Sequence, residues 1–315
     1  GFRLLVTGLL EGEDDSAFAA LPGLSASGTA ANFAAGFSLA KYRRQTAGKA
    51  GPLPGFLSDE RVVLELRVSG GFVDENAAAD QDGYTISVGA IAAYLVNENL
   101  TLGLNLAYQH AEAEGPAVEN TADSFGITAF GQLQLPHRLR LDAVVAYTRS
   151  DIETLITQNG VTGDGDTTAD AFQIQGRLSR SFDVGGWQVT PGLGISYSRI
   201  ERDGFTLSDG TDVAATTTDR LTISAGPSVT RTFSILDGQA SLAPRFGVDL
   251  TMNLGNERDF VREDGGISDL GTVGLGASAG LGIASGPFEA GIDLGYGRFG
   301  DLQNVQIGGR LSYKF

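Results

Sequence analysis

Residues 100–109 read Leu-Thr-Leu-Gly-Leu-Asn-Leu-Ala-Tyr-Gln, and this stretch decides the fold class. Every second residue from Leu100 to Tyr108 is leucine or tyrosine, whereas the residues between them are small or polar. Successive side chains of a β-strand point to opposite faces of a sheet. The period of two therefore predicts a strand with one apolar and one polar face. Residues 139–148 and 305–315 repeat the pattern.

The same period recurs in twelve segments from residue 61 onward. Most of them have about ten alternating residues, the length that a strand tilted by about 45° needs to cross the apolar core of a bilayer. An even number of such segments is typical of bacterial transmembrane barrels. The segments are 61–72, 83–96, 99–110, 122–135, 138–149, 169–182, 187–200, 219–233, 239–253, 270–283, 287–299 and 302–315.

The connections between these segments alternate between long and short. Five long, acidic stretches cover residues 73–82, 111–121, 150–168, 201–218 and 254–269, and brief turns such as 97–99, 136–137 and 236–238 separate them. Transmembrane barrels have long loops on the extracellular side and short turns on the periplasmic side. We therefore predict an all-β fold, a 12-stranded antiparallel transmembrane β-barrel. A soluble β-sandwich or solenoid with one wet face is the alternative.

The two faces of the predicted strands differ in composition. Aromatic residues lie on the apolar face near strand ends, as expected of girdles at the two membrane interfaces. The opposite face is rich in glycine, serine and threonine, including Gly103, Gly192, Gly274 and Gly276, where a packed lumen needs small side chains. We expect that face to line the lumen and to carry these charged side chains: Glu65, Arg67, Arg140, Asp142, Arg177, Arg245, Asp249, Asp293 and Arg310.

Composition excludes several other classes. The chain has 315 residues, with 45 glycines that follow no Gly-X-Y period, so it is not a collagen. It has no cysteine, which excludes disulfides, thiol chemistry and cysteine-bound zinc. A net charge of −16 argues against nucleic acid as a partner. No apolar run is long enough for a transmembrane helix.

The sequence offers little for catalysis or metal binding. Its two histidines, His110 and His137, fall at opposite ends of the predicted strands, so they share no site. Asp164-Gly-Asp166 and residues 257–264 have the spacing of a loop for a hard cation, but neither fits the twelve-residue calcium pattern. Solvated acidic loops that face lipopolysaccharide are the favoured interpretation. We predict no enzyme activity, no cofactor and no metal.

Residues 1–60 do not alternate. The stretches 16–21 and 25–42 are rich in alanine, glycine and serine, and Phe33, Phe37 and Leu39 are the bulky apolar residues of the second stretch. A helix of such small residues suits the inside of a narrow tube. We therefore predict two regions: residues 1–60 as a linker with an α-helical segment that threads the lumen, and residues 61–315 as the barrel. A flexible N-terminal extension is the alternative.

Three stretches give the sequence its resemblance to a known family. Residues 91–108 have a tyrosine strand, a short polar turn and a Leu-Gly strand, and residues 187–205 have a proline-containing strand followed by Asp-Gly-Phe. Residues 242–246 and 308–315 fit closing strands that end in phenylalanine. Together with the strand count, they resemble the translocator domain of autotransporters, the type V secretion barrels. One departure is the stretch of about nineteen residues between Tyr42 and the first strand, longer than the link usual in the family.

The resemblance implies a location and partners. It implies a barrel in the outer membrane of a Gram-negative bacterium that exports or anchors an N-terminal passenger at the cell surface, with the C-terminus in the periplasm. The implied partners are outer-membrane lipid and lipopolysaccharide, periplasmic chaperones, the chain's own passenger, and the barrel-assembly machinery, which would read Leu311, Tyr313 and Phe315. The alternative functions are a passive pore or structural barrel without a passenger, and a soluble adhesive β-domain.

Overall fold

The computed structural model describes residues 61–75, 81–114, 118–158, 161–254, 259–261, 267–269, 273–299 and 302–314. The predicted linker and lumen helix, residues 1–60, and the terminal Phe315 lie outside the described residues. No helix among the described residues is long and apolar enough to cross a membrane.

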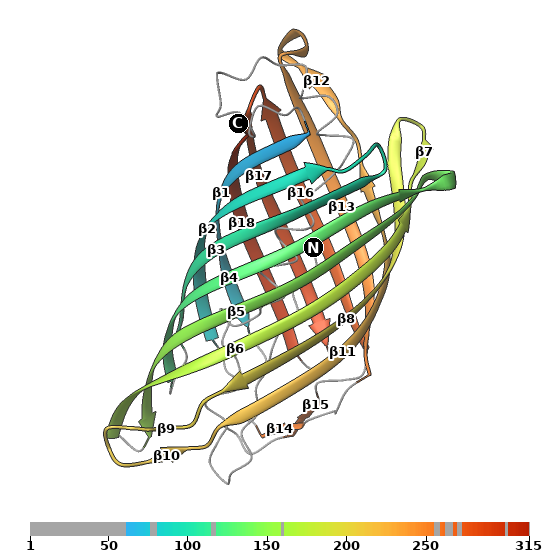
Figure 1. The fold of residues 1–315 in the computed structure, drawn as a ribbon. Coiled ribbons are helices and arrows are strands. Elements are labelled where there is room, and N and C mark those ends of the chain that lie inside the picture. The colour runs from blue at the N-terminus through green and yellow to red at the C-terminus, as the bar shows by residue number, and fades with distance from the viewer. Residues whose placement is uncertain are drawn as a thin grey trace.

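Twelve long antiparallel strands form one closed barrel (Figure 1), which confirms the predicted fold class. Each strand pairs with the next long strand along the chain, and the last pairs with the first. The strands are β1 (Val62–Glu75), β2 (Gln81–Leu95), β3 (Leu100–Glu114), β4 (Val118–Leu135), β5 (Leu139–Gln158), β6 (Val161–Arg180), β8 (Trp187–Arg202), β11 (Thr216–Thr230), β13 (Ala240–Asn253), β16 (Val273–Ser285), β17 (Phe288–Phe299) and β18 (Leu302–Lys314).

The two ends of the barrel differ. At one end, the short strands β7 (Phe182–Val184) and β12 (Phe233–Ile235) extend two hairpins (Figure 1). The 3-10 turn η4 (Leu236–Gly238) closes the hairpin of β12 and β13, and the 3-10 turn η3 (Pro136–Arg138) closes the hairpin of β4 and β5. At the other end lie two small hairpins, β9 (Phe205–Thr206) with β10 (Asp212–Val213) and β14 (Asp259–Val261) with β15 (Ile267–Asp269). We call these the short-turn end and the long-hairpin end.

The prediction of a long loop at residues 150–168 is wrong, because most of these residues belong to strands β5 and β6. Strands β5 and β6 continue in register as far as Gln158 opposite Val161. Residues 150–156 keep the period of two, since Ser150, Ile152 and Thr154 are buried and the acidic residues between them, Asp151 and Glu153, are exposed. Strands β3 and β4 likewise extend into the predicted loop 111–121. The acidic residues belong to the outer face of a sheet that continues beyond the aromatic residues.

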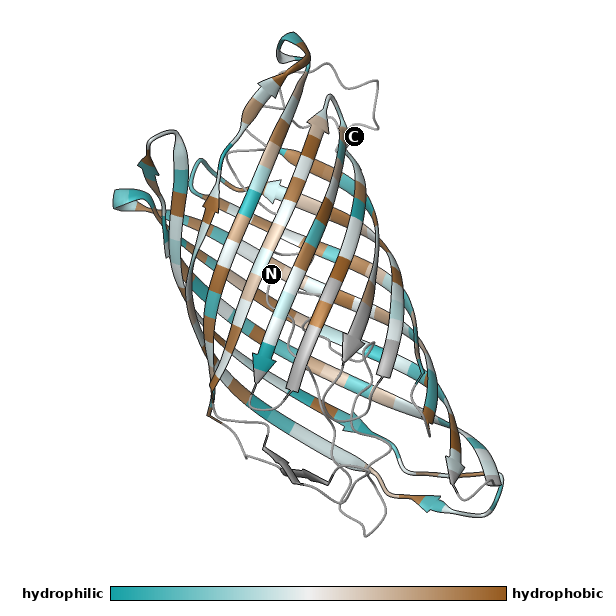
Figure 2. Cartoon of the chain, turned by 180° about the vertical axis from the view of Figure 1, so that it is seen from behind, coloured by the Kyte–Doolittle hydropathy of each residue, from teal (hydrophilic) through white to brown (hydrophobic). Residues whose placement is uncertain are grey.

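The barrel exposes its apolar face and buries its polar one. Leu102, Leu104 and Leu106 on β3 are each about half exposed, at 48–52%, whereas Asn105 between them is 1% exposed. Hydropathy alternates in the same way along the strands in Figure 2. A soluble protein buries its apolar face, but a barrel in lipid turns that face outward.

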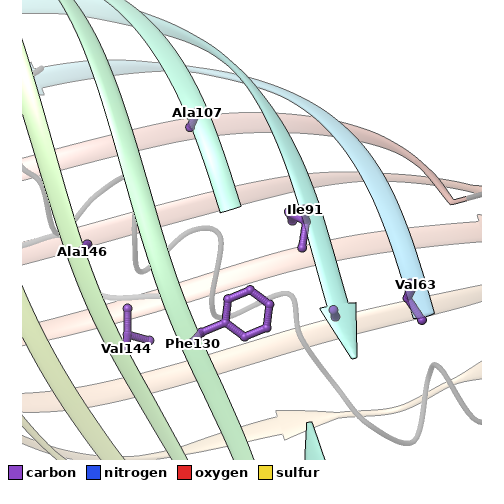
Figure 3. Packing of buried hydrophobic residues seen from close by; sticks show 7 residues of the cluster. Val63, Ile91, Ala107, Phe130, Val144 and Ala146 are labelled. Carbon is purple, nitrogen blue, oxygen red and sulfur yellow. The ribbon is translucent and has the colours of Figure 1, made fainter. Parts of the chain in front are cut away.

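Among the described residues, the largest apolar cluster of the otherwise polar interior has seven members. It is formed by side chains of β1 to β5, namely Val63, Ile91, Ala93, Ala107, Phe130, Val144 and Ala146, several of which are shown in Figure 3. The ring of Phe130 lies over Gly103, where a Cβ atom would stand 2.1 Å from the ring. Glycine at position 103 therefore makes room for the largest side chain of the cluster.

Replacement of Gly103 by alanine should destabilise the barrel. The new methyl group overlaps the Phe130 ring, and overpacking of this kind costs about 1–3 kcal/mol. The temperature of unfolding, measured by circular dichroism in detergent, should fall for Gly103→Ala in the unmodified chain and should fall less when Gly103→Ala is added to Phe130→Leu, which removes the overlapping ring. Gly176→Ala is the control, because its Cβ would make only an ordinary contact of 3.9 Å with Ile195. Equal losses for Gly103→Ala and Gly176→Ala would contradict this account.

Candidate functional site: the barrel lumen

The nine charged residues expected in the lumen all lie at inward positions of the strands. They share the face of the buried polar residues, opposite the exposed apolar ones. β1 carries Glu65 and Arg67, β5 carries Arg140 and Asp142, and β6 carries Arg177. Arg245 and Asp249 are on β13, Asp293 is on β17 and Arg310 is on β18.

Four of the inward charges form a network on strands β13 to β18. A guanidinium nitrogen of Arg245 lies 2.5 Å from Oδ1 of Asp293, and Arg310 reaches the other oxygen of Asp293 at 3.1 Å. Arg310 also lies 3.8 Å from Glu289. Arg245 and Asp293 are on strands that do not touch, with Gly280 of β16 between them. A Cβ at Gly280 would stand 2.2 Å from Oδ1 of Asp293, so glycine clears the way for this ion pair.

A second ion pair crosses two strands by the same means. Arg177 of β6 and Asp249 of β13 approach to 3.7 Å over strands β8 and β11. Gly192 and Gly226 lie opposite each other on those two strands. A Cβ at Gly192 would be 2.6 Å from Arg177, whereas one at Gly226 would be 2.0 Å from the backbone oxygen of Val248 and 2.6 Å from Oδ1 of Asp249. Gly192 therefore leaves space for the side chain of Arg177, and Gly226 leaves space for both the backbone of β13 and the side chain of Asp249.

The remaining inward charges pair with near neighbours. Arg67 donates to Glu65 at 2.7 Å and 3.2 Å, and both side chains are at most 5% exposed. Asp142 accepts hydrogen bonds from Arg140 and from Gln132, each at 2.8 Å. A buried charge is tolerated when a partner and hydrogen bonds satisfy it. These nine charged residues are thus paired along the wall and do not converge on a single reactive centre.

Sequence reasoning missed several lumen residues. Glu289, Arg202 and Arg220 also occupy inward positions, and Glu289 and Arg202 are each 8% exposed. The alternation of the two faces along a strand could have identified Glu289, because it lies four residues before Asp293 on β17 and therefore on the same face. Phe130 was missed because the inner face was expected to be polar throughout.

The geometry offers no catalytic arrangement in the described part of the chain. His110 lies on β3, where its ring nitrogens approach Asp123 at 2.8 Å and Glu112 at 3.2 Å, whereas His137 lies in η3 at the other end. In the ranges that the structure describes, no group of three or more histidine, aspartate and glutamate side chains is placed to hold a metal ion. Asp164 belongs to β6 and accepts a hydrogen bond from Ser208 at 2.6 Å.

The residues expected to form the assembly signal lie at the end of β18. Leu311 is on the outer face and 53% exposed, and Tyr313 packs edge-on against Phe288, with ring centroids 4.9 Å apart. The third residue, Phe315, lies outside the described residues. Their reading by the assembly machinery stays a prediction.

Replacement of Arg177 by glutamine should destabilise the barrel, because Asp249 keeps its charge and loses its partner. Leaving one charged group unsatisfied costs about 1–3 kcal/mol or more. The double variant Arg177→Gln/Asp249→Asn removes both charges and should recover a large part of the loss. Unfolding temperatures of the two single variants and the double variant form a double-mutant cycle. Additive losses would show that the two side chains do not interact.

The family model for the autotransporter beta-domain matches residues 66–298. The structure resembles the translocator domain of the autotransporter NalP from Neisseria meningitidis, with a TM-score of 0.65, 16% identity, and 92% of this chain and 99% of that chain covered. It also resembles the beta domain of the Bordetella autotransporter BrkA, with a TM-score of 0.59, 15% identity, and 80% and 99% covered.

A third solved structure is similar over most of its length. The transport unit of AIDA-I from Escherichia coli matches with a TM-score of 0.51 and 13% identity, covering 88% of this chain and 96% of that one. No curated protein matches the chain in sequence. The likeness to solved structures shows the fold, and the family model covers well over half of the chain. The chain therefore belongs to the autotransporter beta-domain family, and it is an outer-membrane translocator barrel for the export of a passenger.

Proposed function

We propose that residues 1–60 pass through the lumen and connect β1 to a passenger at the cell surface. The observation that carries this proposal is the position at which β1 begins. Val62 opens β1 at the short-turn end, next to the end of β18, and Val63 already belongs to the apolar cluster inside the barrel. Chain that precedes β1 therefore starts beside the mouth of the lumen at that end.

The inner wall has the chemistry that a threaded chain requires. Its apolar cluster on β1 to β5 suits Phe33, Phe37 and the small residues around them. The paired charges on β13 to β18 keep the opposite part of the wall polar, so water and backbone groups find partners there. This mixture supports a role in holding a chain that has both apolar and polar residues.

We further propose that the short-turn end faces the periplasm and the long-hairpin end faces the outside. Long connections on the extracellular side are the rule for outer-membrane barrels. The acidic outer surface of β3 to β6 would then stand at the level of lipopolysaccharide, and Leu311, Tyr313 and Phe315 would be presented to the barrel-assembly machinery from the periplasm. Periplasmic chaperones would deliver the chain there.

No chemical step is part of this function. Autotransporter translocator domains are non-enzymatic barrels, and we propose the same for this chain. Energy for export would come from folding of the passenger outside and from assembly of the barrel.

Removal of residues 1–45 should open the barrel to ions. We expect low single-channel conductance for the intact chain in planar bilayers and a several-fold higher conductance for the truncated one, because the lumen loses its contents. A synthetic peptide of residues 1–45 added to the truncated barrel should reduce the current again, and a scrambled peptide is the control. Equal conductance with and without the segment would favour a passive pore.

The proposed orientation can be tested by labelling, because the chain has no cysteine of its own. Ala214 follows β10 at the long-hairpin end, and Ser234 lies in β12 at the short-turn end; both are exposed. In intact cells, a membrane-impermeant maleimide should label Ala214→Cys at once and Ser234→Cys only after the outer membrane is permeabilised. The reverse order of labelling would overturn the orientation and leave the fold untouched.

A further inference from the structure

The charged side chains of the outer surface have different partners at the two ends of the barrel. At the long-hairpin end, tyrosines on the lipid-facing side donate hydrogen bonds to carboxylates of the next strand. Tyr108 reaches Asp123 at 2.5 Å, Tyr147 reaches Asp170 at 2.5 Å, and Tyr197 reaches Asp219 at 2.6 Å. The arginines there are held by carboxylates as well, since Arg199 lies 2.6 Å from Glu201 and Arg149 lies 3.7 Å from Asp170. This end presents a surplus of negative charge to the membrane.

At the short-turn end, Arg180 and Arg231 lie against aromatic rings instead. The guanidinium carbon of Arg180 lies 5.0 Å from the ring centre of Phe182. That of Arg231 lies 4.8 Å from the ring of Phe233 and 5.8 Å from the ring of Trp187. Attraction between a cation and the face of a ring holds such a side chain in place without neutralising its charge.

These two arginines have no ion-pair partner among the residues that the structure describes. The carboxylate of Asp183, which lies between Phe182 and Val184 on β7, is bound by Arg138 at 2.5 Å. Arg180 and Arg231 therefore carry full positive charges that no carboxylate of the described chain satisfies.

Strand register places Arg180, Arg231 and the aromatic rings that they contact on the lipid-facing side of the barrel. The pairing of β8 continues without a shift from β6 into β7, and the pairing of β13 continues from β11 into β12. Arg180 therefore shares its face with the exposed Leu178, and Arg231 shares its face with Phe233. Trp187 packs against the exposed Phe246, with ring centroids 6.4 Å apart. The cations and the rings thus border the same strip of outer wall over β6, β8, β11 and β13.

We propose that Arg231, with Trp187 and Phe233, and Arg180, with Phe182, each bind the headgroup phosphate of an anionic phospholipid in the leaflet at the short-turn end. The exposed rings, 41% for Phe182 and 37% for Phe233, lie where acyl chains meet headgroups, as interfacial aromatics do. Arginine donates several N–H groups to phosphate oxygens and suits that ligand. The carboxylates at the opposite end repel the same headgroup, so both sites belong to one leaflet.

The two sites do not depend on export of a passenger, and the purified full chain tests them. In zwitterionic detergent, phosphatidylglycerol and phosphatidylcholine with identical acyl chains are added at the same molar ratio, and unfolding temperatures are measured. A ligand that binds the folded state raises that temperature. We expect phosphatidylglycerol to raise it more than phosphatidylcholine does, and we expect native mass spectrometry to show a retained phosphatidylglycerol.

The variants assign the effect to the two sites. In Arg180→Gln/Arg231→Gln, phosphatidylglycerol should raise the unfolding temperature no more than phosphatidylcholine does, so the excess shift is lost. Arg231→Gln alone should lose part of this excess shift. Arg149→Gln/Arg199→Gln makes the same change of net charge at the other end and should keep the excess. Because both lipids are compared within each variant, differences in intrinsic stability cancel.

Three outcomes would overturn the proposal. They are equal shifts by both lipids in the unmodified chain, an excess that survives in Arg180→Gln/Arg231→Gln, and an equal loss in the control variant. Inorganic phosphate and glycerol phosphate form a further arm. If they reproduce the whole shift, the ligand is a free phosphate and not a lipid.

Discussion

Hydrocarbon offers no partner to a backbone N–H or C=O group, and the whole structure depends on that constraint. A sheet in the bilayer must therefore close on itself, so that no strand edge meets lipid. Closure is achieved where β1 pairs with β18, from Glu65 opposite Lys314 to Glu75 opposite Asn304. Once the sheet is closed, its outer face contacts lipid and its inner face lines the lumen. The apolar side chains must face outward, and the polar ones share a confined interior in which charges need partners.

Glycine residues in the wall leave room for the long side chains of the interior. Two ion pairs, Arg245 with Asp293 and Arg177 with Asp249, join strands that are not neighbours, and the positions between them are Gly280, Gly192 and Gly226. Gly103 serves the apolar cluster in the same way, beneath Phe130. A high glycine content therefore reflects long side chains that lie along the wall across their neighbours.

The period of two was enough to predict the strand number, the faces of the strands and the class of fold, because lipid imposes a simple alternation on each strand. It failed at residues 150–168, where the outward positions change from apolar to acidic while the strand continues. It also missed Phe130 as a lumen residue. Which charged residues pair depends on the register across several strands, as for Arg177 and Asp249. A local sequence pattern does not show which residues of strands far apart in the chain come together.

The pairing of β1 with β18 also affects the rate at which the barrel assembles. Along the described chain, every other pairing in the barrel joins strands that are consecutive among the twelve, so the loop that each of them closes is far shorter than the barrel sequence and costs less chain entropy. β1 and β18 are separated by almost the whole barrel sequence. Assembly therefore has one slow step of high contact order. Until β18 has been synthesised and delivered, the edge of β1 stays unsatisfied, and a partner that occupies this edge would govern the rate at which the barrel forms.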